Sequence, residues 1–456
     1  MNVAIQAQAA DVEAIRELLS PWDVSVTNLD EADVVIVYKD KPMETKKTIV
    51  IPSDSAECMK WVKEMKLTVA RKPGEPVFVA ASKQTVLTIK PQVLYCYDGL
   101  VKPVPRDTPP TLGEVDDNLL FLTLDIVKEY DKILDETLNA KPSTAYRLLT
   151  SLPFPYTIAP RRLKDFFLKD RAGHENFTLC DKLQLDALRL ILVRAIDKLF
   201  KEEIRKKTWN GKRYACIVTH DIETLKGLQR AKRLKKLEEK YDVASAWYIP
   251  SKRYELNLET IRELASYGEV GAHDTMHDGK LLQLPEEKLV KRLHEAKQTL
   301  EKITNCPVEG FRAPLLQHST RFIRALDKAG YSYDTSIPTW EPMHPSTFGP
   351  HSIGTTHPLH VNGIIEVPVS VPQDHQMIKC LGMTLSRTVE TWLEIRDAIK
   401  DLGGIYTILI HPDYEFGSPS GQDIYEDLLH RICADDLALF AVPSQITAVN
   451  ENKFLR

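Results

Sequence analysis

Four short groups of residues in the second half of the chain carry side chains that could perform hydrolysis. They are Thr219-His220-Asp221-Ile222-Glu223, His273-Asp274-Thr275-Met276-His277, Phe311-Arg312-Ala313-Pro314 and Ile410-His411-Pro412. Each group follows a short apolar run that is typical of a β-strand. Together they offer imidazole and carboxylate ligands for a metal ion, a carboxylate base, an arginine and a further histidine as an acid. A metal-dependent amide hydrolase needs these groups.

His273 and His277 stand four residues apart, directly after a predicted strand. If a helical turn begins there, the two imidazoles project to one face and could share a metal ion. The spacing alone is weak evidence, because it arises often by chance. Twelve of the thirteen histidines lie after residue 219, so this part of the chain holds several other candidates for a ligand.

Asp221 and Glu223 are two residues apart at the end of another predicted strand, so in extended chain their side chains point to the same side. One carboxylate could act as a base while the other binds a metal ion. Alternatively, Glu223 only begins the next helix, where a carboxylate interacts favourably with the helix dipole. In that case Asp221 would bind the metal itself. His220 points to the opposite side of the strand, and a structural role is predicted for it.

Arg312 and His411 also follow predicted strands. The guanidinium of arginine is a planar fork of donors that can hold a carboxylate in place, although a surface arginine is the alternative. His411 comes after the strongly apolar run 405–410 and before Pro412, which indicates a loop beyond a buried strand. A histidine at such a place is often a hydrogen-bonded core residue, and it can also be an acid.

The elements that must position these residues follow a regular alternation from residue 214 onward. Strand patterns occur at residues 214–219, 244–249, 268–272, 309–312, 331–334, 364–369, 405–410 and 437–442. Helical patterns occur at residues 224–240, 259–267, 285–303, 319–329, 388–402 and 421–435. This alternation predicts parallel strands with helical crossovers, and its length favours an α/β fold with a (β/α) barrel of seven or eight strands. Active sites of such barrels lie at the carboxyl ends of the strands, where all four groups fall.

The order of the four groups and the residues within each group resemble those of the polysaccharide deacetylase family (NodB homology, carbohydrate esterases) over roughly residues 212–447. The resemblance implies a distorted barrel in which Asp221 is the base, Arg312 orients it and His411 is the general acid. It also implies that Glu223 completes a metal site with His273 and His277. Most members of the family have adjacent aspartates in the first group, and this chain resembles a subset with Asp-x-Asp or Asp-x-Glu.

One residue departs from the family pattern, because Asp274 stands where the family usually has Ser or Thr. Asp274 could steady the backbone of the metal loop or hold a ligating histidine. Asp413 or Asp334 is predicted to fix the tautomer of His411. Asp334 and Asp374 could be groove residues or simple caps.

The resemblance implies removal of an acetyl group from an N-acetylated amino sugar or polysaccharide, with a metal-bound water as the nucleophile. Zinc is expected for two histidines and one carboxylate, with cobalt, nickel or iron as alternatives. Two other functions stay open. The first is hydrolysis of a different amide or imide, as in allantoinase-like or formamide-cleaving relatives, and the second is an inactive carbohydrate-binding protein.

Composition limits the partners and the compartment. The chain has 456 residues, a net charge of −4 and a pI of about 6.4, which argues against nucleic acid as a partner. Seven scattered cysteines without a CxxC pair favour a reduced compartment. The first residues do not read as a signal peptide, and no apolar stretch reaches the roughly 18 residues of a membrane span. A cytoplasmic protein is therefore expected.

The first half of the chain lacks recognisable chemistry. Residues 1–102 alternate strands and helices and predict a small α/β domain, with strands at 2–6, 24–28, 33–39 and 48–52, helices at 11–19 and 56–65, and a hairpin over 77–89. The Pro-rich stretch 101–110 predicts a linker. Residues 111–208 are predicted to be a helical connecting or cap region, with helices at 117–137 and 181–206. This half could cover the barrel mouth or mediate homo-oligomerisation.

Overall fold

The structure is a computed structural model that describes 182–344 and 349–454 in the second half of the chain. In the first half it describes residues 1–40, 46–51 and 125–140, and the short strands at 77–80, 86–89, 93–95, 101–103, 112–116 and 119–122. The chain divides into two compact units, one of residues 1–135 with 180–207 and the other of residues 136–179 with 208–456.

The second unit is built on a curled sheet in which eight neighbouring strands run parallel. These strands are β11 (Tyr214–Asp221), β12 (Ala246–Ile249), β13 (Glu269–Ala272), β14 (Gly310–Phe311), β15 (Tyr333–Asp334), β19 (Ile364–Glu366), β20 (Ile405–Ile410) and β21 (Ala438–Phe440). The sheet order is β18-β19-β15-β14-β13-β12-β11-β20, with β21 also paired to β11 and with β18 (Leu359–Val361) antiparallel to β19. All eight predicted strands are thereby confirmed, as is the (β/α) barrel class.

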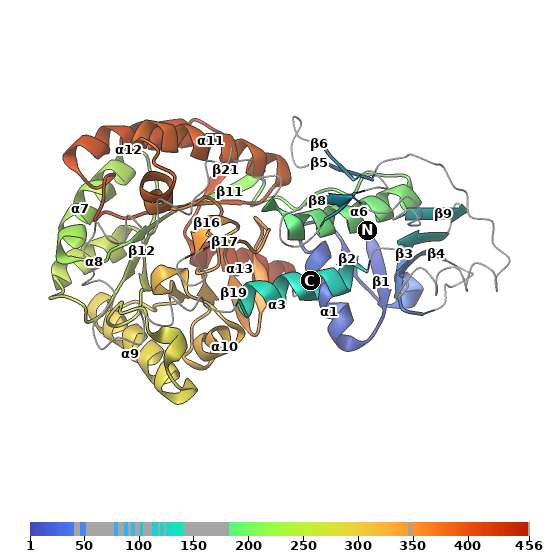
Figure 1. Cartoon of the computed structure of the whole chain (residues 1–456), viewed down its shortest axis with the longest axis horizontal. Coiled ribbons are helices and arrows are strands. Elements are labelled where there is room, and N and C mark those ends of the chain that lie inside the picture. The colour runs from blue at the N-terminus through green and yellow to red at the C-terminus, as the bar shows by residue number, and fades with distance from the viewer. Residues whose placement is uncertain are drawn as a thin grey trace. The chain divides into compact units, whose positions relative to one another are not determined.

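Six helices surround these strands in Figure 1. They are α7 (Leu225–Lys240), α8 (Leu258–Tyr267), α9 (Glu286–Thr304), α10 (Thr320–Lys328), α11 (Leu385–Leu402) and α12 (Pro419–Cys433), and each matches a predicted helix. Five begin with a residue whose side chain accepts a hydrogen bond from the first turn, namely Thr224, Asn257, Ser319, Thr384 and Ser418. Each cap fixes the residue at which the loop after a strand ends and the helix begins. The last helix, α13 (Pro443–Phe454), follows β21.

Two tyrosines fill the inside of the barrel, because two glycines leave room for their rings. A Cβ atom at Gly310 would lie 1.9 Å from the ring of Tyr333, and one at Gly271 would lie 2.4 Å from the ring of Tyr248. The two tyrosine hydroxyls are 2.9 Å apart. Arg312, which directly follows β14, lies over the ring of Tyr248.

The gap between β19 and β20 is bridged by a side chain. The Ser370 hydroxyl accepts a hydrogen bond of 2.6 Å from the Thr407 backbone N–H, and lies 3.5 Å from the Thr407 carbonyl. The segment after β19 therefore lies against β20. A hairpin that sequence patterns did not predict, β16 (Glu341–His344) with β17 (Gly349–His351), follows β15.

The first unit is a smaller α/β structure with a six-stranded sheet in the order β2-β1-β3-β4-β10-β9. The strands are β1 (Asn2–Gln6), β2 (Ser25–Val26), β3 (Val34–Tyr38), β4 (Lys47–Ile51), β9 (Leu112–Asp116) and β10 (Leu119–Leu122). The helices are α1 (Ala9–Leu19), α6 (Gln184–Phe200) and most of α3 (Ile126–Leu138), with a short 3₁₀ turn η1 (Leu29–Glu31). Two further antiparallel pairs are β5 (Val77–Ala80) with β6 (Val86–Ile89) and β7 (Val93–Tyr95) with β8 (Val101–Pro103).

Several predictions for the first half need correction. The helix predicted at 117–137 begins only at Ile126, because Leu119–Leu122 pairs as a strand with β4 and β9. A four-residue apolar run fits a strand and a helix equally well, and the open edge of β4 decides between them. Val101–Pro103, predicted as linker, pairs with β7. The helix predicted at 181–206 ends at Phe200.

Helix α6, from the segment predicted to connect or cap, lies in the first unit and packs against α1 and β4. The hairpin predicted over 77–89 is confirmed for its two strands. The helix predicted at 56–65 lies outside the described residues.

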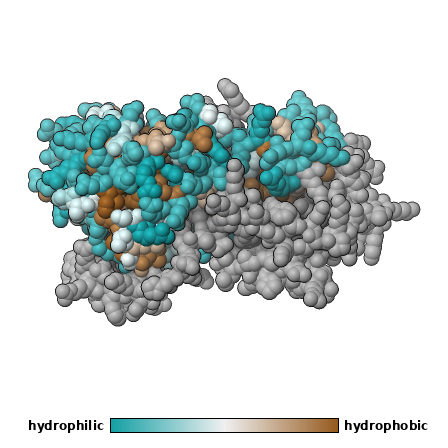
Figure 2. Space-filling model, turned by 90° about the horizontal axis from the view of Figure 1, so that it is seen from above, coloured by the Kyte–Doolittle hydropathy of each residue, from teal (hydrophilic) through white to brown (hydrophobic). Residues whose placement is uncertain are grey.

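None of the helices in the described parts of the chain combines the length and apolar character needed to cross a membrane. On the face shown in Figure 2, most of the coloured surface over the second unit is hydrophilic.

His220 has the structural role that its position predicts. Its Nε2 lies 2.7 Å from a Glu238 carboxylate oxygen, and its ring stacks on Trp247 with centroids 4.1 Å apart. Glu238 also accepts hydrogen bonds from the hydroxyls of Ser245 and Tyr425. The carboxylate therefore satisfies three buried donors at once.

We expect Glu238→Ala to lower the free energy of unfolding of the second unit by about 3–5 kcal/mol, because the buried partners lose their acceptor. Chemical denaturation followed by tryptophan fluorescence measures this change. Glu239→Ala is the matched control, because Glu239 is next to Glu238 on α7 but pairs with Lys235 at the surface. Equal stability of the two variants would contradict the structural role of the buried network.

Candidate active site

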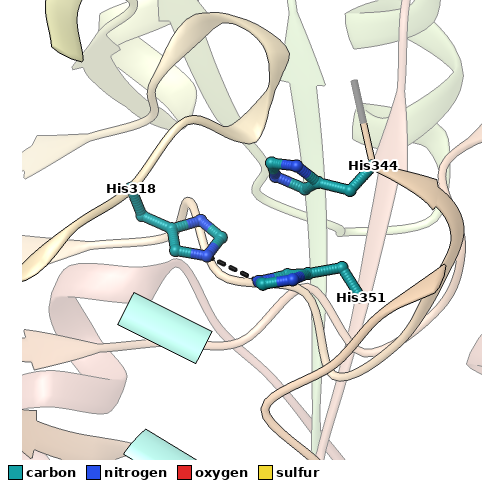
Figure 3. Close-up of side chains that lie close together, drawn as sticks. All are labelled: His318, His344 and His351. Atoms are coloured by element: carbon teal, nitrogen blue, oxygen red, sulfur yellow. Dashed lines mark hydrogen bonds between the residues drawn. The ribbon is translucent and has the colours of Figure 1, made fainter. Parts of the chain in front are cut away.

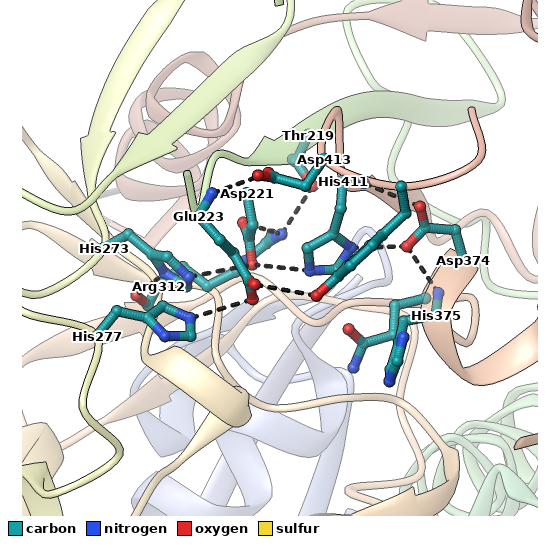
Figure 4. Close-up of polar contacts among 12 residues, drawn as sticks. Thr219, Asp221, Glu223, His273, His277, Arg312, Asp374, His375, His411 and Asp413 are labelled. Atoms are coloured by element: carbon teal, nitrogen blue, oxygen red, sulfur yellow. Dashed lines mark hydrogen bonds and ion pairs between the residues drawn. The ribbon is translucent and has the colours of Figure 1, made fainter. Parts of the chain in front are cut away.

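The four sequence groups converge at the carboxyl ends of the parallel strands, as Figure 4 shows. Asp221 is the last residue of β11, and His273, Arg312 and His411 directly follow β13, β14 and β20. Glu223 lies in the short loop between β11 and α7. The structure thus brings together all six residues that the sequence singled out, with His277 completing the set.

Arg312 holds Asp221 in place and is itself held by the neighbouring strand. Its Nη1 donates to Asp221 Oδ1 at 3.3 Å and to the Thr219 hydroxyl at 2.9 Å. Its Nε and Nη2 donate to the backbone carbonyl and the hydroxyl of Thr335, each at 2.9 Å. The side chain is fully buried and lies over the ring of Tyr248. This arrangement fixes Oδ1 and leaves Oδ2 facing two histidines.

Those two histidines lie on either side of Asp221 Oδ2. The Nε2 atom of His273 is 3.8 Å from it, and the Nε2 atom of His411 is 4.0 Å from it. Asp221 therefore occupies the centre of the site, where a proton can pass to or from its free oxygen.

A metal ion fits the group Glu223, His273 and His277, whose candidate ligand atoms lie within 4.8 Å of one another. His273 Nδ1 is 2.7 Å from the Arg312 carbonyl. Because a carbonyl only accepts, Nδ1 carries the proton and Nε2 is left with a free lone pair. Within the described residues, this buried Nε2 and both ring nitrogens of His277 lack a hydrogen-bond partner. Such orphaned atoms are costly unless they bind something, which supports their assignment as ligands.

The third candidate ligand, Glu223, is also held by its neighbours. Glu223 Oε1 lies 3.2 Å from His277 Nε2, while Glu223 Oε2 accepts a hydrogen bond of 3.0 Å from the Tyr414 hydroxyl. Burial alone would raise the pKa of Glu223, but His277 beside it holds the pKa well below the usual range. Burial lowers the pKa of His273 to about 4. Both groups are thus in the protonation states that ligate metals.

The two histidines meet without the helical turn on which their predicted pairing depended. Residues 273–277 form a loop in which Asp274 and His277 have φ of 70° and 51°. Asp274 Oδ2 accepts a hydrogen bond of 2.9 Å from the His277 backbone N–H, and both its oxygens pair with Arg292. Asp274 therefore steadies the loop backbone, and Arg292 balances its buried charge.

His411 is oriented by Asp374, and not by Asp413 or Asp334 as predicted. Asp374 Oδ1 lies 2.6 Å from His411 Nδ1, and its Oδ2 accepts from the His411 backbone N–H at 3.0 Å. Burial alone would lower the pKa of His411, but the Asp374 carboxylate outweighs it and raises the pKa to about 10. Asp334 instead accepts a hydrogen bond from the Ser336 hydroxyl, and Asp413 accepts from Glu223 and Thr224.

Asp413 joins the two loops that carry the site. Its carboxylate accepts hydrogen bonds from the Glu223 backbone N–H at 3.0 Å and from the Thr224 hydroxyl. A Cβ atom at Gly227 would lie 2.3 Å from this carboxylate, so the position requires glycine. Arg230 adds hydrogen bonds to three consecutive carbonyls of the loop after β20. Neither Arg230 nor Tyr414 stood out in the sequence, where the nearby Asp413 was the only signal.

We expect Asp374→Asn to move the alkaline limb of the pH–rate profile to a pH about 1–3 lower, because an opposite charge of this kind shifts a pKa by that much. An acid must be protonated, so activity is present below its pKa and is lost as the pH rises through it. Removing the carboxylate lowers the pKa of His411, so activity is lost at a lower pH. Turnover measured from pH 6 to 10 tests this, with the exposed Asp397→Asn as the control. An unchanged alkaline limb would mean that Asp374 does not set the protonation of His411.

Part of the second unit matches a known family model. Residues 215–333 match the family model described as polysaccharide deacetylase. That range contains Asp221, Glu223, His273, His277 and Arg312, and it ends before His411. A search of curated proteins finds no match.

Solved structures give similar folds at low identity. A candidate polysaccharide deacetylase from Mycobacterium smegmatis is 21% identical, with a TM-score of 0.46, over 55% of this chain and 94% of that chain. The Puue allantoinase is 14% identical, with a TM-score of 0.40, over 53% of this chain and 91% of that chain. A mutant of a CE4-family pseudoenzyme with restored activity is 14% identical, with a TM-score of 0.36, over 51% of this chain and 67% of that chain. Likenesses this low do not indicate a shared substrate.

The match of the family model covers the first three of the four motifs, and His411 lies beyond it. Over residues 215–333, the chain is similar to the polysaccharide deacetylase family.

Proposed function

We propose that the chain is a metal-dependent deacetylase that removes the acetyl group from an N-acetylated amino sugar or glycan. The observation that carries this proposal is the position of Asp221. Its Oδ1 is fixed by Arg312 at 3.3 Å, and its Oδ2 faces His273 on one side and His411 on the other. A base, an acid and a metal site therefore surround one small space, as hydrolysis of an amide requires.

The residues would divide the reaction as follows. Glu223, His273 and His277 would hold the ion, and a divalent metal in such a site polarises an acyl oxygen and makes water a better nucleophile. Asp221 Oδ2 would take the proton from the attacking water, while Arg312 keeps the carboxylate oriented. His411 carries protons on both ring nitrogens, because Asp374 holds Nδ1–H and raises the pKa of the ring to about 10. Its Nε2–H would protonate the leaving amine.

Zinc is the metal we propose, because two neutral imidazoles and one carboxylate are common ligands of catalytic zinc. Cobalt, nickel and iron accept similar ligands. Glu223 fits better as a ligand than Asp221, because Arg312 already neutralises Asp221 while Glu223 Oε1 points at His277.

The test is acetate release from acetylated amino sugars of increasing chain length, with metal-free protein resupplied with Zn²⁺ or Co²⁺. Release that depends on added metal and disappears in His411→Ala supports the proposal. Hydrolysis of allantoin or formamides with no acetate release would indicate a different amide hydrolase. Binding of glycans without any hydrolysis would indicate an inactive carbohydrate-binding protein.

A further inference from the structure

Three histidines that play no part in the candidate active site meet elsewhere in the second unit, as Figure 3 shows. His318 follows the turn after β14, His344 ends β16 and His351 ends β17. One nitrogen from each lies within 4.8 Å of the other two, and the ring centroids are 4.6–5.3 Å apart. All three side chains are buried, with exposures of 3–8%. Three imidazoles from separate segments thus surround one point.

The backbone around this point directs the ring nitrogens. The Leu316 carbonyl lies 2.7 Å from His318 Nδ1 and 3.1 Å from His344 Nε2. Because a carbonyl only accepts, these two nitrogens carry protons and the opposite nitrogen of each ring keeps its lone pair. Metal-binding histidines are oriented in the same way by a carbonyl on the second nitrogen.

The carbonyl is turned toward the rings by an unusual stretch of backbone. Leu315 and Leu316 have φ of 60° and 50°, the left-handed region that leucine rarely adopts. Two such residues in succession cost free energy, and they persist where the surroundings hold them. Their result is a single acceptor shared by two histidines.

Burial keeps the three rings neutral. It lowers the pKa of His318 to about 4 and that of His344 to about 3, with His318 adding to the second effect. Burial, together with His344 and His318, also holds the pKa of His351 well below the usual range. Neutral imidazole is the form that donates its lone pair to a metal ion.

We propose that His318, His344 and His351 form a second site for a divalent transition-metal ion, separate from the site of Glu223, His273 and His277. Three imidazoles suit Zn²⁺, Co²⁺, Ni²⁺ and Cu²⁺ better than the hard cations Mg²⁺ and Ca²⁺, which prefer oxygen. His318 Nε2 and His351 Nε2 are 2.7 Å apart. Tetrahedral zinc with bonds of about 2.0–2.1 Å places its ligand nitrogens about 3.4 Å apart, so a small movement of His351 would admit the ion.

The ion would tie the β16–β17 hairpin to the turn after β14. The same hairpin is already bonded to the segment that carries Asp374. Gln373 Nε2 donates to Glu341 Oε1 at 2.6 Å, and Gln376 Nε2 donates to the Met343 carbonyl at 2.7 Å. The second metal would therefore stabilise the support of His411 without contacting it.

The alternative is that the histidines only pack against one another. His318 Nε2 can accept a hydrogen bond from His351 Nε2–H at 2.7 Å, and this contact needs no metal. Counting bound metal separates the two cases, because packing alone binds none.

The experiment measures bound metal in the full chain after chelator treatment, resupply with Zn²⁺ or Co²⁺ and removal of excess. We expect about two equivalents in the unaltered chain. Loss of one equivalent is expected in the His318→Ala/His344→Ala variant and in the His273→Ala/His277→Ala variant. The visible spectrum of bound Co²⁺ should lose a different component in each variant. His360→Ala is the control, because His360 is an exposed histidine on β18.

Metal content that is the same in the unaltered chain and in His318→Ala/His344→Ala overturns the proposal. If that variant does not fold, His351→Gln removes one ligand from the β17 strand and should weaken binding to one equivalent by at least about 10-fold. Unchanged affinity there also overturns it. If the His318→Ala/His344→Ala variant loses metal and the His273→Ala/His277→Ala variant does not, the result supports the site of His318, His344 and His351. It contradicts the site of Glu223, His273 and His277.

Discussion

The variant His273→Ala/His277→Ala should lose one equivalent of metal and at least about a thousandfold in turnover of an acetylated substrate. Loss of an ion that contributes several kcal/mol to the stabilisation of the transition state has an effect of this size. Among the described residues, the two side chains offer three buried nitrogens without hydrogen-bond partners, so the variant lacks both imidazoles proposed as ligands beside Glu223. Elemental analysis and acetate release from one preparation measure both losses.

Stability distinguishes this effect from a failure to fold. The double variant loses the hydrogen bond of His273 with the Arg312 carbonyl and the contact of His277 with Glu223, so it should unfold cooperatively but at a lower temperature than the metal-free unaltered chain. His294→Ala is a matched control, because His294 is an exposed histidine on α9. A double variant that keeps full turnover would show that these histidines do not hold the catalytic ion.

The barrel was predictable because the residue pattern of each strand and helix agrees with the place of that element in the fold. Strands such as β11 and β20 are buried apolar runs, and six helices with helical apolar spacing, five of them with a side-chain cap, lie between most of the strands. Each motif is attached to such a strand, so predicting the strand also placed the motif at the active edge.

The missed features depend on contacts between distant parts of the chain. Asp374 reaches His411 across 37 positions, and its neighbours Gln373 and His375 give no sign of this pairing. Arg230 bonds the loop of Pro412, Asp413 and Tyr414 across more than 180 positions. The sequence favoured Asp413 or Asp334 for this role and did not connect Asp374 with His411. The folded barrel determines which of these aspartates lies beside His411.

Local ambiguity explains the errors in the first half. Leu119–Leu122 is too short for periodicity to separate strand from helix, and pairing with β4 makes it a strand. The HxxxH pair is an instructive contrast. Its spacing predicted the correct meeting of the rings through a helical turn, but left-handed Asp274 and His277 bring them together in a loop.

The second large effect concerns the two carboxylates of the loop after β11. Asp221→Asn keeps an oxygen for Arg312 but cannot accept a proton, so turnover should fall by about 10²–10⁴-fold, the usual contribution of a general base. Metal should remain bound, because Asp221 is not among the proposed ligands. Glu223→Ala removes a ligand, and metal affinity should fall by at least about 10- to 100-fold. Titration with Zn²⁺ and acetate release at each metal concentration measure the two effects separately.

Excess metal distinguishes the roles most sharply. It should restore part of the activity of Glu223→Ala, because His273 and His277 can still bind a weakly held ion, and none of the activity of Asp221→Asn. Tyr414→Phe should have a smaller effect, because it removes only the hydroxyl that donates to Glu223 Oε2. It should lower the affinity for the metal without abolishing the site. If Asp221→Asn instead loses the ion while Glu223→Ala keeps it, the assignment is reversed. Asp221 would then be the ligand, and Glu223 would become the nearest carboxylate able to act as the base.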